Sequence, residues 1–269
     1  MASQHSTGRK SKSSARPSAP KRKPDRAGAA VAVPEGYFEW SRDPAVGLFV
    51  IMPLWLTYEV LRQFFVPRTM NLAEYWVKEQ FYTLPRVVLD VYSIAVALAV
   101  AIAAWSLLRR QIPWVRVGLV VVLEGSVYGL MLGPIAAQLT RHSMPVLELN
   151  AVDGPLFANL IGSLGAGVFE ELVFRLVLLS GLAWLFVRAL KSFHMHRSIA
   201  IGLALLASSL LFSLFHHVGV GLAELEPKVF VFRAMAGIQL GILFITRGLG
   251  VCVYTHAMYD VFYYLSKHE

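Results

Sequence analysis

The feature that most constrains this chain is a long apolar stretch, residues 156–190, with three ionisable side chains at its centre: Glu170, Glu171 and Arg175. At about 35 residues it exceeds the ~20 residues that an α-helix needs to cross a bilayer. We expect either one long tilted helix or a re-entrant segment followed by a span. In both arrangements the ionisable groups are costly at membrane depth, so they should face a protein interior or a wet cavity.

Helical spacing gives the two adjacent carboxylates different neighbours. Glu171 and Arg175 are four residues apart, so they share a helix face and can form an ion pair. Glu170 points about 100° away from Glu171 at ~3.6 residues per turn. Arg175 can therefore hold one carboxylate while the other is available for catalysis. The alternative is a purely structural ion pair beside a solvated Glu170 at a helix end.

The composition is typical of a membrane protein, because 56% of the 269 residues are hydrophobic and only 16% are charged. We predict an all-α fold, a polytopic transmembrane helical bundle of about seven spans, with six to eight as the range. The single cysteine, Cys252, lies in an apolar run and is interpreted as a small buried residue. The predicted spans are residues 44–66, 88–108, 117–139, 156–190, 198–216, 229–246 and 249–266.

The net charge of +8 comes mostly from the N-terminal tail, where residues 1–26 carry eight Lys or Arg against Asp25. We expect residues 1–40 to be a disordered, basic cytoplasmic tail that touches anionic lipid, with no nucleic-acid partner. Residues 41–114 would form the N-terminal membrane spans. We expect an integral multi-pass protein of a cell inner or plasma membrane, and the Lys/Arg bias of its loops agrees with seven spans and an N-terminus in the cytoplasm.

Later spans carry the groups with which a carboxylate could do chemistry. Phe212 and His216 have Phe-xxx-His spacing on one helix face, and His256 and Asp260 are four residues apart near the C-terminus. A single histidine on an apolar helix face is usually a core residue with no catalytic role. Two histidine-bearing helices beside a Glu-Glu helix in one small membrane domain instead favour acid–base catalysis.

The ordered motifs Glu-Glu-xxx-Arg, Phe-xxx-His and His-xxx-Asp on successive spans resemble the CPBP family, the CAAX proteases and bacteriocin-processing enzymes also called Abi. This family consists of intramembrane endopeptidases related to the type II CAAX prenyl protease. The resemblance covers residues 115–266, which would be the catalytic membrane domain.

The resemblance implies roles for the first two motifs. Glu170 and His216 would together activate a water molecule for peptide hydrolysis. Glu171 and Arg175 would hold the first motif in register and tune Glu170. The implied partners are membrane lipid and a peptide or protein substrate with a membrane-proximal cleavage site.

The resemblance also implies that His256 and Asp260 stabilise the tetrahedral oxyanion. Many relatives place Asn where this chain has Asp260, and an ionised carboxylate cannot donate a hydrogen bond. Asp260 would therefore be protonated, orient His256 or bind a metal. A divalent metal such as zinc would take Glu170, His216, His256 and Asp260 as ligands. The sequence has no His-Glu-xx-His zinc motif, and water activation by Glu and His needs no metal, so the favoured mechanism requires no cofactor.

Two other functions fit the same residues. A non-catalytic membrane binding or bacteriocin-immunity protein could keep this scaffold, but retention of Glu170, His216 and His256 favours the enzyme. A proton-coupled transporter could use Glu124, Glu170 and Asp260. No internal inverted repeat supports that reading.

Overall fold

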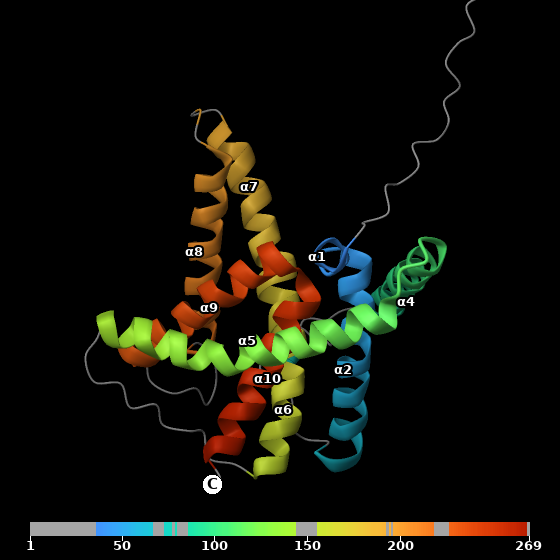
Figure 1. Ribbon diagram of the computed structural model, residues 1–269, viewed down its shortest axis with the longest axis horizontal. Helices are drawn as coiled ribbons and strands as arrows, with labels where there is room; N and C mark the ends of the chain where they lie inside the picture. The colour runs from blue at the N-terminus through green and yellow to red at the C-terminus, as the bar shows by residue number, and fades with distance from the viewer. Residues whose placement is uncertain are drawn as a thin grey trace, which may run out of the picture. The chain divides into compact units, whose positions relative to one another are not determined.

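The computed structural model describes residues 36–66, 73–76, 79, 86–143, 155–191, 194, 196–217 and 226–267, and regular secondary structure in these ranges is helical (Figure 1). These residues belong to one compact unit, Pro34–Glu269. The helices are α1 Tyr37–Trp40, α2 Pro44–Phe65, α4 Arg86–Arg109, α5 Trp114–Ser143, α6 Leu156–Glu171, η1 Leu172–Leu179, α7 Ser180–Lys191, α8 Arg197–Phe215, α9 Pro227–Arg247 and α10 Leu249–Lys267.

The predicted all-α membrane bundle is confirmed. Within the described ranges, five helical elements are long and apolar enough to cross a membrane: α2, α5, the continuous element Leu156–Lys191, α8 and α9. The two other predicted spans correspond to α4 and α10, which are also helical. Residues 156–190 thus form one helical element rather than a re-entrant segment followed by a span. The chain is an integral membrane protein.

The N-terminal boundary of the bundle lies earlier than predicted. Residues 1–35 of the expected tail lie outside the described residues. Tyr37–Trp40, which we assigned to the same tail, instead form α1. The reason is a long-range anchor, because the Tyr37 hydroxyl donates a hydrogen bond to Glu124 of α5. The Arg247 guanidinium of α9 also donates to Glu124, over 2.6 and 2.8 Å. The intramembrane Glu124 is therefore a link between helices.

Helix α2 begins where its sequence provides a strong N-terminal cap. The Asp43 carboxylate accepts hydrogen bonds from the backbone N–H groups of Ala45 and Val46, and Pro44 occupies the first turn. Arg110, just after α4, pairs with Asp43 over 2.5 Å. Burial alone would raise the pKa of Asp43, but hydrogen bonds from Arg110 and from the two N–H groups hold it below its usual value. This ion pair joins the start of α2 to the end of α4.

Helix α10 is central to the bundle, because it packs against α2, α5, α6 and α9. Its approach to α6 is so close that a Cβ atom on Gly167 would lie 2.6 Å from the Cβ atom of Ala257 and 2.8 Å from its backbone nitrogen. Gly167 precedes Glu170 by three residues, and Ala257 follows His256 directly. The contact between the two backbones therefore sets how near the predicted site residues Glu170 and His256 come to each other.

Replacing Gly167 by alanine should force α6 and α10 apart. Overpacking of this kind costs about 1–3 kcal/mol, so we expect Gly167→Ala to lower the thermal unfolding midpoint in detergent. Gly162→Ala on the same helix is the matched control, because a Cβ at Gly162 meets nothing within 4 Å. Equal midpoints for the two variants would contradict this account of the α6–α10 contact.

Candidate active site

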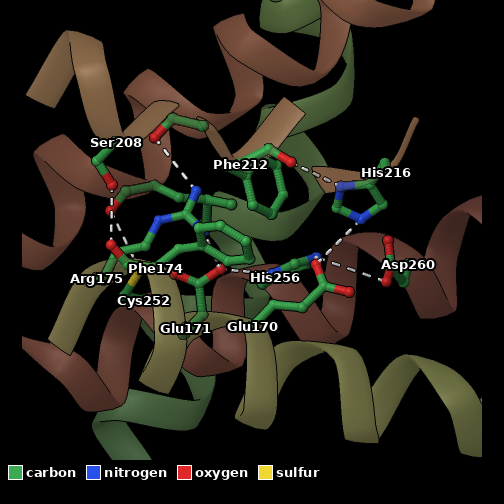
Figure 2. A network of polar contacts seen from close by, with 12 residues as sticks. Glu170, Glu171, Phe174, Arg175, Ser208, Phe212, His216, Cys252, His256 and Asp260 are labelled. Carbon is green, nitrogen blue, oxygen red and sulfur yellow. Dashed lines mark hydrogen bonds and ion pairs between the residues drawn. The ribbon is translucent and has the colours of Figure 1, made fainter. Parts of the chain in front are cut away.

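The six predicted site residues come together from four helical elements (Figure 2). Glu170 and Glu171 are the last two residues of α6, and Arg175 lies in η1. His216 follows the last residue of α8 directly, and α10 supplies His256 and Asp260. The first motif and His256 are almost withdrawn from the surface, with relative exposures of 3% for Glu170, 0% for Glu171, 1% for Arg175 and 6% for His256.

Glu171 accepts hydrogen bonds from three side chains. Arg175 donates from Nη1 to Oε1 over 2.9 Å, which confirms the predicted pair. His256 donates from Nδ1 to the same oxygen over 2.6 Å, and the Cys252 thiol lies 2.9 Å from Oε2. Because a carboxylate only accepts, Nδ1 of His256 carries a proton. The ring is thereby oriented with Nε2 toward Glu170 and Asp260.

The Arg175 guanidinium connects the site to two further helices. Its Nη2 donates to the backbone carbonyl of Gly237 in α9 over 3.3 Å. Its central carbon lies 4.4 Å from the centroid of the Phe212 ring, a cation–π contact with α8. The Phe212 centroid lies 4.9 Å from that of His216. The phenylalanine of the Phe-xxx-His motif thus separates the guanidinium from the imidazole.

Glu170 faces the two imidazoles. Its Oε2 lies 3.5 Å from Nε2 of His216 and 3.8 Å from Nε2 of His256. Nδ1 of His216 lies 2.8 Å from the carbonyl oxygen of Phe212, and a carbonyl can only accept. A neutral His216 therefore carries its proton on Nδ1 and presents the Nε2 lone pair toward Glu170. A carboxylate and an imidazole, the two usual kinds of general base, converge on one region.

Asp260 lies beside His256 rather than at hydrogen-bond distance from it. The separation between its Oδ2 and Nε2 of His256 is 3.7 Å. The two carboxylates Glu171 and Asp260 thus stand at opposite nitrogens of one ring. This placement suits the holding of a positively charged imidazolium, whose Nε2–H could donate to an oxyanion.

A π-helical segment, η1, begins immediately after Glu171. Such segments are rare and frequently occur at functional sites. Two hydroxyl groups donate hydrogen bonds to its backbone carbonyls. Ser208 of α8 donates to the carbonyl of Phe174 over 2.9 Å, and Ser180 donates to the carbonyl of Arg175 over 3.2 Å. The Ser208 bond also ties η1 to the helix that carries His216.

Sequence reasoning missed two contributors to this site. Cys252 is fully buried, as expected, but its thiol contacts Glu171 instead of being only apolar filler. Its spacing from His256, four residues on one helix, was a usable signal. Ser208 lies in an apolar helix with no spacing motif, so nothing in the sequence identified its bond to η1.

The side-chain arrangement does not support the metal site considered from the sequence. Across the described ranges, no three His, Cys, Asp or Glu side chains are placed so that they could hold one metal ion together.

Removing the Arg175 side chain should lower both stability and activity, because it leaves Glu171 buried without its guanidinium. Breaking a buried ion pair costs about 3–5 kcal/mol, and we expect a correspondingly lower thermal unfolding midpoint for Arg175→Ala. The control is Arg188→Ala, which removes an exposed arginine from α7 of the same helical element. A folded, fully active Arg175→Ala would show that this pair is dispensable.

A known family model matches part of the chain. Residues 153–262 match the family model described as "Type II CAAX prenyl endopeptidase Rce1-like", which confirms the resemblance read from the motifs. The matched segment contains all three motifs and begins within the predicted range 115–266. No curated protein and no solved structure matches the chain significantly.

Proposed function

Because residues 153–262 are Rce1-like, we propose that this integral membrane protein is an intramembrane endopeptidase that uses Glu170 and His216 as the base for a hydrolytic water. The observation that carries the proposal is the convergence of these two groups. Glu170 Oε2 and His216 Nε2 lie 3.5 Å apart. The hydrogen bond from Arg175 is accepted by a different carboxylate, that of Glu171.

The proposed reaction is ordinary peptide hydrolysis. A water molecule loses a proton to the Glu170–His216 pair as its oxygen bonds to the scissile carbonyl carbon. The carbonyl oxygen becomes an oxyanion, which a protonated His256 stabilises by donating from Nε2. The proton held by the base then passes to the leaving amine as the C–N bond breaks. Glu171 and Asp260 act by holding and orienting His256.

The roles proposed for the rest of the chain follow from this assignment. The reaction requires no metal, because the base and the oxyanion donor are both protein groups. The partners are membrane lipid and a peptide or protein substrate cleaved near the membrane, with no nucleic acid. The N-terminus lies in the cytoplasm, on the side of the basic loops. Glu124 does not take part, because Arg247 and Tyr37 already engage it.

Loss of either base should abolish cleavage while leaving insertion and fold intact. We expect Glu170→Gln and His216→Ala each to reduce turnover by at least about 100-fold, the usual contribution of general acid–base catalysis. The assay uses full-length protein in liposomes with a library of transmembrane and prenylated peptides, read by mass spectrometry. His217→Ala, which removes the neighbouring histidine, is the matched control and should keep most of the activity.

Unimpaired turnover by Glu170→Gln or His216→Ala would overturn the assignment. A parallel reaction with a chelator tests the metal-free mechanism, which predicts undiminished cleavage. Loss of activity in chelator that added zinc restores would refute it. Absence of cleavage by a well-folded wild type across the whole library would favour a non-catalytic binding protein on the same scaffold.

A further inference from the structure

Arg233 in α9 differs from the other arginines that are buried in the bundle. Its side chain is partly buried, yet within the described residues its guanidinium makes no hydrogen bond or ion pair. Four other arginines each pair with a carboxylate: Arg62 with Glu59, Arg110 with Asp43, Arg175 with Glu171 and Arg247 with Glu124. An unmatched guanidinium in a membrane-spanning helix is costly and is a candidate functional group.

The register of α9 places Arg233 on the face that meets the active-site helix α8. Phe230, three residues before it, accepts a hydrogen bond at its carbonyl from Ser213 of α8. Gly237, four residues after it, packs against Phe212 and accepts from Arg175. Residues at these spacings share one helix face. Arg233 therefore lies on the side of α9 that borders the catalytic residues.

The electrostatic surroundings of Arg233 also connect it to the candidate active site. The acidic groups whose charges act on its guanidinium are the carboxylates of Glu170 and Asp260 and the phenols of Tyr259 and Tyr264. The third carboxylate of the site, Glu171, is already matched by Arg175. An incoming anion would be repelled by Glu170 and Asp260 unless a cation stood beside them. Arg233 supplies that cation at the border of the site.

We propose that Arg233 is a specificity-determining residue that binds a carboxylate of the substrate close to the scissile bond. This inference rests on the proposed endopeptidase function and adds the chemical class of substrate that the site prefers. A guanidinium matches a carboxylate with two parallel hydrogen bonds, which an ammonium or an amide cannot reproduce. The carboxylate can be the C-terminal group of the substrate or an acidic side chain near it.

Binding to an inactive protein tests this preference independently of turnover. The full chain carrying His216→Ala, which keeps the charges of Glu170 and Asp260, is placed in phosphatidylcholine liposomes. The probes are a fluorescent farnesylated tetrapeptide as the free acid, the same peptide as the C-terminal amide, and an amide whose last residue is Asp. A charged hydrogen-bonded contact predicts that the acid binds roughly tenfold or more tightly than the amide.

Variants at Arg233 should remove this preference selectively. Arg233→Gln should bring the affinity for the acid down to that for the amide and leave the amide unchanged. Arg233→Lys should keep only part of the preference, because it retains the charge without the planar fork. Lys228→Gln, which removes another positive charge from α9, is the matched control and should keep the full preference.

The binding results for the three probes distinguish the possible sources of the carboxylate. Tight binding of the Asp-containing amide would identify a side-chain carboxylate as sufficient, whereas preference for the free acid alone would identify the C-terminus. Equal binding of acid and amide with Arg233 intact would overturn the proposal, even if Arg233→Gln failed to fold. Equal losses of affinity for the acid and the amide in Arg233→Gln would also overturn the proposal. They would indicate that Arg233 only alters the electrostatic environment of Asp260 and does not contact the substrate carboxylate.

Cleavage by the protein with His216 intact separates the two proposals. A strong acid preference without cleavage of any probe would retain the carboxylate site and count against the endopeptidase. Cleavage of acid and amide with the same KM would retain the endopeptidase and remove the role of Arg233.

Discussion

The rest of the structure depends on one buried carboxylate, Glu171, which has 0% exposure and accepts from Arg175, Cys252 and His256. A buried charge destabilises a protein unless its lone pairs are satisfied. The partners of Glu171 come from η1 and α10, and Arg175 extends the network to α9 through the carbonyl of Gly237. This carboxylate and the close contact between α6 and α10 therefore fix the register of α6 against α10. That register places the preceding residue, Glu170, against the two histidines.

Contacts within one helix could be predicted from the sequence. The Glu171–Arg175 pair depends only on four-residue spacing within one helical element, and the π-helical turn that follows Glu171 does not break it. The contact of Phe212 with His216 depends on the same spacing. The helices themselves could be predicted because long apolar runs have few alternatives in a membrane. Local periodicity is sufficient to predict these features.

Contacts between helices could not be predicted in the same way. The bond from His256 to Glu171 joins residues 85 positions apart, and the Arg247–Glu124 pair joins residues 123 apart. Both depend on which helix faces pack together, which periodicity leaves open. The same limit explains the error at α1, because residues that look like tail are held by a partner in α5. The π-helical turn of η1 depends on hydroxyl donors such as Ser208 from a neighbouring helix.

In the proposed mechanism, the two adjacent glutamates therefore divide stability and reactivity between them. Glu171 belongs to a set of groups bonded at 2.6–2.9 Å, which is suited to hold helices together. Glu170 faces the Nε2 atoms of His216 and His256 at 3.5 and 3.8 Å, and Asp260 stands 3.7 Å from His256. His256 joins the two sets, with Nδ1 committed to Glu171 and Nε2 directed to Glu170. In the proposed mechanism Glu170 exchanges protons while Glu171 holds the helices together, and the ~100° turn between neighbouring helix positions separates these two tasks.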